Sequence, residues 1–159
     1  MQRSAVLTVR VPDGVCRTFR HACRRSGILE TGGMLFGEHV ADEEFRILEA
    51  TVAGRGTPSQ FVRALVPGLL RLERFFRRTK HDYARFNYLG EWHSHPRFPL
   101  VPSWKDDSSM REIVCDPRTG ARFVILLLVT VHQNALRARG FLYEAGIGRE
   151  EVSILVEAC

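Results

Sequence analysis

The sequence has few cysteines and no long apolar run, and each absence argues against a class of protein. No C-x-x-C pair occurs among the four cysteines, which are Cys16, Cys23, Cys115 and Cys159. Residues 1–12 carry charge in an alternating pattern and lack the continuous apolar block of a secretory signal, so a disulfide framework is not expected. The most apolar stretch, residues 123–131, is too short to cross a bilayer as a helix. These features predict a cytoplasmic protein that does not associate with a membrane.

Lysine is scarce as well. Only Lys80 and Lys105 are lysines among the 23 basic residues, so arginine carries the formal net charge of +5. The arginines recur at helical spacing opposite apolar positions, which predicts solvated helix faces. Nucleic-acid binding would need basic residues interleaved with stacking aromatic side chains on one surface, and that pattern is not evident. The sequence therefore predicts no nucleic-acid partner.

The length of 159 residues is enough for one domain with a hydrophobic core, and we expect a single domain over residues 1–159. Alternating or continuous apolar residues predict strands at residues 5–11, 34–36, 45–53, 88–95, 122–131, 135–143 and 152–156. Helical spacing and capping residues predict helices at residues 12–26, 67–84 and 103–115, the first with Gly27 as its C-cap. Residues 54–66 have the composition of a surface loop. Since these elements mix without strict βαβ alternation, we expect an α/β fold with one mixed β-sheet flanked by helices.

The segment His93-Ser94-His95-Pro96, together with Ser103 and Asp106, indicates chemistry. Side chains two residues apart on a strand point the same way, so His93 and His95 can bind one metal ion. Asp106 lies in the first turn of a predicted helix whose N-cap is Ser103. A Ser-x-x-Asp tetrad commonly does no more than cap a helix. Capping does not explain the paired histidines, nor the short loop that brings the start of the helix back beside them. Two histidines and one carboxylate leave a tetrahedral Zn²⁺ one open position for water, which is the catalytic pattern.

A hydrolytic zinc site also needs a base. Zinc lowers the pKa of its water from about 15.7 towards roughly 7, and a base must carry the released proton to the leaving amine. Glu91 shares the predicted face of the histidines, and Glu30 begins the segment ETGGMLFG, whose glycines permit close approach of the backbone. Glu38 directly follows that segment. Spacing alone does not choose among these three glutamates.

Together these residues resemble a known family. Glu30, then His93-x-His95, seven residues, Ser103, two residues and Asp106 resemble the motif of the JAMM (MPN-plus) metallopeptidases. The phrases ETGGMLFG and GEWHSHP resemble the small prokaryotic JAB-domain branch, and the resemblance covers essentially the whole chain. It implies a cytidine-deaminase-like fold and one Zn²⁺ per chain, with a bound water, held by His93, His95 and Asp106. It also implies Glu30 as general base and proton shuttle, and Ser103 as hydrogen-bond donor to the tetrahedral oxyanion.

The resemblance implies a function too. Members of the family cut isopeptide or peptide bonds after the C-terminal tail of ubiquitin or a ubiquitin-like protein. This chain is then expected to deconjugate or process a ubiquitin-like protein, in an operon with E1-like and E2-like proteins such as an antiphage defence system. Such a tail can add a strand to a sheet edge, for which residues 54–63 are the candidate edge and residues 97–101 the candidate channel wall.

Three alternatives stay open at the level of sequence. A sulfur-carrier peptidase that releases cysteine from a carrier tail would use the same metal chemistry. A non-catalytic MPN scaffold belongs to another class, and such scaffolds usually lose a ligand or the glutamate, all of which are present here. A nucleic-acid-associated role resembling that of RadC proteins would be accompanied by a helix-hairpin-helix region, which this sequence lacks.

Overall fold

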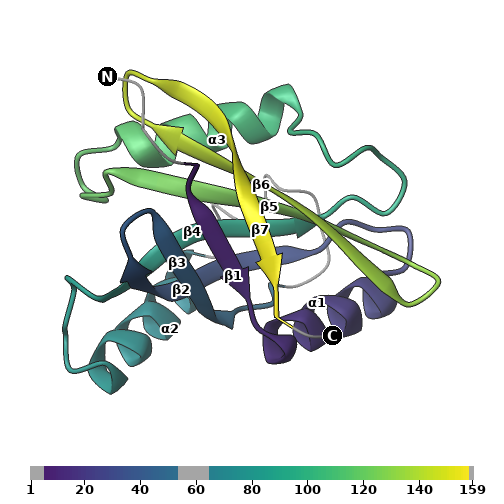
Figure 1. Cartoon of the computed structure of the whole chain (residues 1–159), viewed down its shortest axis with the longest axis horizontal. Helices are drawn as coiled ribbons and strands as arrows, with labels where there is room; N and C mark the ends of the chain where they lie inside the picture. The colour runs from purple at the N-terminus through teal and green to yellow at the C-terminus, as the bar shows by residue number, and fades with distance from the viewer. Residues whose placement is uncertain (1–5, 54–64, 158–159) are drawn as a thin grey trace.

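The computed structural model describes residues 6–53 and 65–157. Figure 1 shows the course of the chain through them. The elements, in chain order, are β1 (Thr8–Val11), α1 (Asp13–Ser26), β2 (Gly32–Ala41), β3 (Glu44–Ala50), α2 (Leu65–Arg78), β4 (Phe86–Ser94), α3 (Trp104–Cys115), β5 (Phe123–His132), β6 (Ala135–Glu144) and β7 (Gly148–Val156).

The strands of the described residues form one mixed sheet that closes on itself in the order β1-β3-β2-β4-β5-β6-β7. The pairs β1–β3, β4–β5 and β1–β7 are parallel, and the others are antiparallel. The predicted mixed sheet flanked by helices is therefore confirmed. Its closure was not predicted, because the β1–β7 pairing joins the two ends of the sequence and leaves no local pattern.

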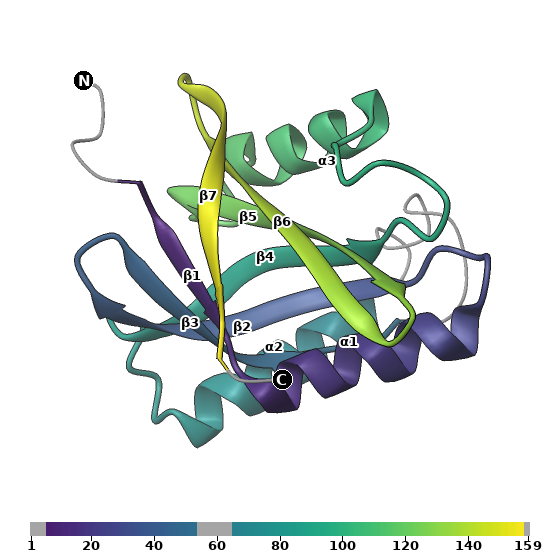
Figure 2. The ribbon, with the colours of Figure 1, turned by 45° about the vertical axis from the view of Figure 1, so that its right-hand side comes forward.

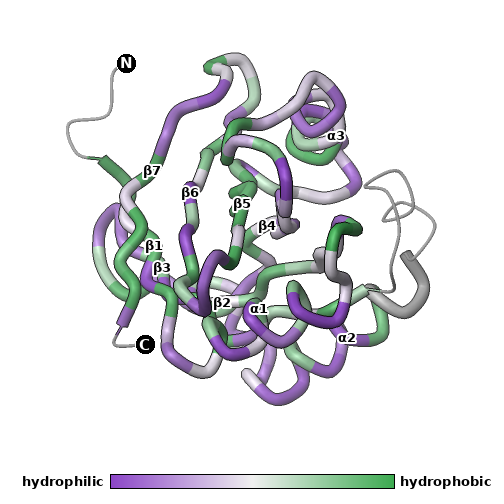
Figure 3. The backbone as a smooth tube through the Cα atoms, turned by 90° about the vertical axis from the view of Figure 1, so that its right-hand side faces the viewer, coloured by the Kyte–Doolittle hydropathy of each residue, from purple (hydrophilic) through white to green (hydrophobic). Residues whose placement is uncertain are grey.

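Two hydrophobic clusters lie on opposite sides of β5, which explains its continuous apolar run. Ile125, Leu127 and Val129 face a core to which α1 and every strand contribute. The alternate residues of β5 face a second cluster, formed with β6 and with Met110 and Val114 of α3. Figures 1 and 2 show α1 and α3 on opposite sides of the sheet, and the tube in Figure 3 is green along much of β5. α2 contacts β2 and β4.

The helix ends follow local signals in two cases and not in the third. α1 begins after the extended Pro12 and ends at Ser26, and its C-cap is Gly27, whose φ of 59° favours glycine. α3 begins after Ser103, as predicted. α2 is different, because the predicted span of residues 67–84 is wrong at both ends. The helix ends at Arg78, since Lys80 and His81 adopt φ values of 56° and 57°, which a right-handed helix cannot accommodate.

Part of the predicted loop at residues 54–66 lies outside the described residues, as does the candidate edge at residues 54–63. The last two residues of the predicted loop, 65 and 66, belong to α2. No helix within the described residues combines the length and the apolar character that crossing a membrane requires.

A bulge in β4 determines which side chains of this strand face α3. The register against β2 shifts between Leu35 and Phe36, opposite Gly90, whose φ is 143°. A Cβ atom on Gly90 would lie 1.9 Å from the backbone oxygen of Ile125, so only glycine fits. Because of the extra residue, Leu89 and Trp92 both reach the core shared with α1. His93 is thereby directed towards Asp106 of α3.

Candidate metal centre

The end of β4 and the first turn of α3 bring three predicted ligands together. His93 is paired with Gly32 of β2 on one side and Leu128 of β5 on the other. His95 follows the strand, and its backbone N–H donates to the carbonyl of Val129 at 2.9 Å. The side chains of His93, His95 and Asp106 are buried, and one ligand atom from each lies within 4.8 Å of the others.

The carboxylate of Asp106 lies close to both imidazole rings. Its Oδ1 is 3.4 Å from Nε2 of His93, and its Oδ2 is 3.8 Å from Nε2 of His95. The ring centroids of His93 and His95 are 5.3 Å apart. Both Nε2 atoms and the carboxylate thus converge on one small region.

Hydrogen bonds orient two of these groups. Nδ1 of His95 lies 2.9 Å from the carbonyl oxygen of Pro99, which can only accept, so Nδ1 carries a proton and the Nε2 atom of a neutral ring presents its lone pair. Oδ2 of Asp106 accepts from the backbone N–H of Ser103 at 2.7 Å and from its hydroxyl at 2.8 Å. Oγ of Ser103 also accepts from the backbone N–H of Asp106. The predicted capping box is confirmed.

His93 supplies the test of whether a metal ion fits. Its Nε2 atom is buried and has no hydrogen-bond partner within the described residues, because the contact with Oδ1 of Asp106 at 3.4 Å does not have hydrogen-bond geometry. Buried polar atoms are normally satisfied. Burial lowers the pKa of His93 to about 4, while Asp106 raises it and His95 lowers it. Neutral imidazole is the form that ligates a metal ion. The buried group of His93, His95 and Asp106 is therefore positioned to bind a metal ion.

Glu30 lies near this group because β2 pairs with β4. The backbone N–H of Ser94 donates to the carbonyl of Thr31 at 2.8 Å, and the Thr31 N–H donates back to Oγ of Ser94 at 3.0 Å. Burial raises the pKa of Glu30, His95 lowers it, Asp106 raises it and Lys105 lowers it. Two of the candidate ligands, His95 and Asp106, thus act on the Glu30 carboxyl, which places it within electrostatic range of them.

The other two glutamates have different surroundings. Glu38 pairs with Arg85 at 3.0 Å, six residues along β2 from Gly32 and hence about 20 Å from the site. Burial raises the pKa of Glu91 to about 7. The charge of Glu91 raises the pKa of Tyr88. Burial, and not the charge of a candidate ligand, is the cause of the raised pKa of Glu91 itself. The surroundings favour Glu30 over both.

Sequence analysis missed the role of Ser94, which fastens the segment containing Glu30 to β4. The alternation His-Ser-His was a usable signal, because it places the Ser94 side chain on the face opposite the ligands. The Trp92 side chain also lies on this opposite face and packs on α1, where its ring centroid is 4.6 Å from that of Phe19. Trp92 Nε1 also donates to the carbonyl of Thr51 at 2.8 Å.

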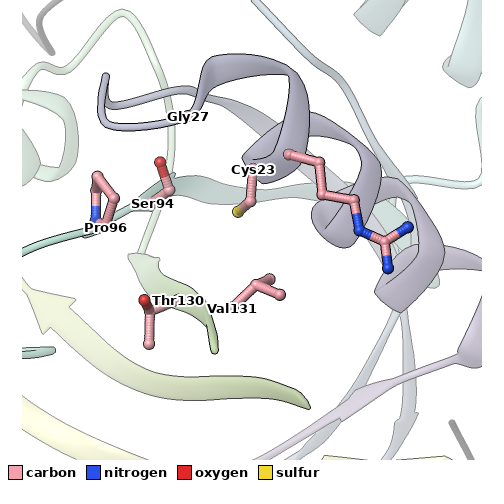
Figure 4. A pocket seen from close by; sticks show the side chains of 7 residues that line it. Cys23, Gly27, Ser94, Pro96, Thr130 and Val131 are labelled. Carbon is pink, nitrogen blue, oxygen red and sulfur yellow. The ribbon is translucent and has the colours of Figure 1, made fainter. Parts of the chain in front are cut away.

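A small pocket lies beside Ser94, as Figure 4 shows. Its volume is about 100 Å³, and Cys23 and Gly27 line it from α1 and the residue after it. Thr130 and Val131 line it from β5. Burial raises the pKa of the Cys23 thiol to about 11, so this thiol is protonated at neutral pH and is a poor nucleophile.

The chain is similar to several known proteins. Among curated proteins, it is 32% identical over 123 residues to a protein of Enterobacter hormaechei subsp. hoffmannii named CD-NTase/cGAS isopeptidase. The match covers 70% of this chain and 61% of that protein, so the chain spans less than two thirds of the relative's length.

Two solved structures share the fold. A protein from Desulfitobacterium hafniense has a TM-score of 0.65 at 16% identity, with 95% of this chain and 94% of that chain covered. One from Salinibacter ruber has a TM-score of 0.54 at 15% identity, with 93% and 91% covered. These identities show the fold alone. Residues 12–140 match the family described as prokaryotic homologs of the JAB domain. The match extends over most of the chain and includes Glu30 and all three candidate ligands, so the protein belongs to the prokaryotic JAB family.

Proposed function

We propose that this protein is a zinc-dependent isopeptidase or peptidase that cleaves after the C-terminal tail of a ubiquitin-like protein. One observation carries the proposal. His93, His95 and Asp106 form a buried group in which Nε2 of His93 has no hydrogen-bond partner within the described residues. Membership of the JAB family and the name of the Enterobacter relative, an isopeptidase, support this kind of reaction.

His93, His95 and Asp106 would hold the metal ion. When bound, Zn²⁺ supplies a Lewis acid and lowers the pKa of water to near neutrality. Pro99 keeps the lone pair of His95 Nε2 directed inward through its bond to Nδ1. Ser103 orients the carboxylate of Asp106. Its backbone N–H and its hydroxyl donate to Oδ2, which leaves Oδ1 facing His93.

Glu30 would act as general base and then as general acid. Its carboxylate takes a proton from the attacking water and delivers it to the amine that leaves when the peptide or isopeptide bond breaks. A raised pKa suits this double role, because the group must both accept and release a proton near neutral pH. The bonds between Ser94 and Thr31 hold the backbone next to Glu30 in place.

Ser103 would donate to the oxyanion of the tetrahedral intermediate. Its single hydroxyl proton points to Oδ2 of Asp106, so it must turn towards the substrate during the reaction. Oγ can continue to accept from the Asp106 N–H while the proton turns, so the cap and the oxyanion role are compatible.

The surroundings of the site fit an extended apolar tail. Phe98 and Trp104 are exposed, at 63% and 84%, and the Phe98 ring lies 6.3 Å from that of His95. This supports residues 97–101 as a channel wall. The name of the relative suggests a conjugated CD-NTase as the first substrate to test, with E1-like and E2-like proteins as further partners. No feature of the described residues favours the sulfur-carrier peptidase or the non-catalytic scaffold.

The test combines metal analysis with cleavage. The purified chain is incubated with each ubiquitin-like protein of its genome, fused to a reporter, with and without a chelator, and bound zinc is measured by mass spectrometry. Glu30→Gln should keep the metal and lose cleavage, whereas His95→Ala should lose both. Glu38→Gln is the matched control and should lose neither. A folded wild-type protein without metal, or normal turnover by Glu30→Gln, would contradict the proposal.

A further inference from the structure

Two strands hold the start of α3 through one carboxylate. Tyr143 of β6 is 1% exposed, and its hydroxyl donates to Oδ1 of Asp107 at 2.7 Å. Arg149 of β7 is paired with Tyr143 across the sheet and donates to both carboxylate oxygens of Asp107, at 2.8 and 2.9 Å. Asp107 directly follows the ligand Asp106, so these contacts restrain the backbone that carries it.

The same face of the sheet holds the loop after His95. Arg139 lies four residues before Tyr143 on β6, and its Nη1 donates to the carbonyl of Leu100 at 3.2 Å. Its Nε and Nη2 bind Glu151 of β7 at 2.8 and 2.7 Å, which holds the guanidinium in place. The residue before Leu100 is Pro99, whose carbonyl orients His95. Arg139 therefore restrains the segment that sets the direction of the His95 ring.

Arg139 and Arg149 both contact one aromatic ring. The guanidinium carbons of Arg139 and Arg149 lie 5.3 and 5.5 Å from the ring centroid of Phe141, which is buried. Cations over an aromatic face are attracted to it. The contacts to the loop and to α3 are thus parts of one unit on β6 and β7.

The geometry points to a role for this unit at the metal site. We propose that Arg139, Tyr143 and Arg149 are positioning residues that hold His95 and Asp106 in the arrangement that binds the metal ion. The inference rests on the proposed function, because it requires that these side chains be ligands. The contacts that this unit makes outside β6 and β7 end at Asp107, one residue from Asp106, and at the carbonyl of Leu100, one residue from the Pro99 carbonyl that orients His95.

The experiment measures metal affinity apart from stability. The dissociation constant for Zn²⁺ is determined by competition with a chromophoric chelator for the wild type and for Tyr143→Phe, Arg149→Met and Arg139→Met. Each variant should bind zinc about tenfold more weakly, at the lower end of the range for outer partners of metal ligands. Arg85→Met is the matched control, because Arg85 makes a comparable two-pronged contact with Glu38 far from the site. Arg85→Met should bind zinc with wild-type affinity. Without metal, it should unfold at a temperature similar to those of the other variants.

Asp107→Asn provides a second, isosteric variant should Tyr143→Phe fail to fold. The amide that this substitution introduces keeps an acceptor for Tyr143 and lacks the charge that pairs with Arg149. If Asp107 transmits the restraint, the effects of Asp107→Asn and Arg149→Met on zinc affinity should be far from additive. Wild-type affinity in all of these variants would overturn the positioning role and leave the proposed function intact. A wild-type protein that binds no zinc would instead refute the proposed function.

Discussion

Ser103 illustrates how one side chain can serve both the fold and the reaction. Its hydroxyl caps α3, donates to Asp106 and is the proposed oxyanion donor. Loss of one oxyanion donor typically lowers the rate about 10²–10³-fold, whereas replacing an N-cap serine by glycine costs only a few tenths of a kcal/mol.

We therefore expect Ser103→Gly to keep nearly full stability and to lose kcat about 10²-fold or more at saturating zinc. Ser103→Thr keeps the hydroxyl and should retain most activity. Steady-state kinetics with thermal unfolding of each variant check this. An unchanged kcat in Ser103→Gly would leave Ser103 with the capping role alone.

Lys105 offers a test of the pKa of Glu30. The positive charge of Lys105 favours the carboxylate and lowers that pKa. Removing the charge in Lys105→Met should raise the pKa of Glu30, so that more of the base is protonated at a given acidic pH. The acid limb of the kcat/KM profile should then move to higher pH, and the shift should shrink as salt is added.

Lys80→Met is the matched control, since it removes the only other lysine, which follows α2. Its pH profile should coincide with that of the wild type. If Lys105→Met leaves the acid limb where it was, Glu30 is not the group that titrates there.

At the scale of elements, the site depends on how β2 is joined to β4. Ser94 accepts from the buried backbone N–H of Thr31, next to Glu30. Leaving such a donor unpaired costs about 1–3 kcal/mol, and the segment is expected to shift towards a new partner.

Ser94→Ala should consequently lower kcat about tenfold and keep the zinc content, because His93 and His95 point to the opposite face of the strand. Metal analysis and kinetics on one preparation test both statements. Ser153→Ala, at an exposed position of β7, should change neither quantity. Loss of zinc in Ser94→Ala would mean that the strand itself, and not Glu30, had moved.

Local sequence signals predicted most of the helices and strands. They failed where contacts with residues distant in the chain determine the local structure. The Pro12 and Gly27 boundaries of α1 were predicted because capping depends on neighbours in the chain. The bulge at Gly90 was not, because the carbonyl of Ile125 that demands a glycine there comes from another strand. α2 ends earlier than its helical spacing suggested, since the turn at Lys80 and His81 takes the chain into β4.

At the scale of the whole molecule, metal binding should be coupled to folding. The three candidate ligands come from β4, the residue after it and α3, so they assemble only in the folded chain. A ligand that binds only the folded state stabilises it by about 2.7 kcal/mol at a hundred times its dissociation constant. For a chain of this size that corresponds to a rise in Tm of roughly 5–10 °C.

We expect zinc to raise the Tm of the wild type by about this amount and to leave the Tm of His95→Ala unchanged. Differential scanning calorimetry of metal-free and zinc-loaded samples measures both. Equal Tm values for the two wild-type samples would argue against a metal site formed by these residues.

The sequence by itself determined the candidate ligands and the cap, because His93-x-His95 and Ser103-x-x-Asp106 are relations between near neighbours, which strand and helix periodicity translate directly into direction. It could not choose among Glu30, Glu38 and Glu91, and it did not reveal the closed sheet. The tertiary structure places Thr31, next to Glu30, against Ser94, pairs Glu38 with Arg85 far from the site, and joins β1 to β7. These contacts link residues far apart in the chain, and such pairings follow from the packing of the whole fold and leave no periodic mark in the sequence.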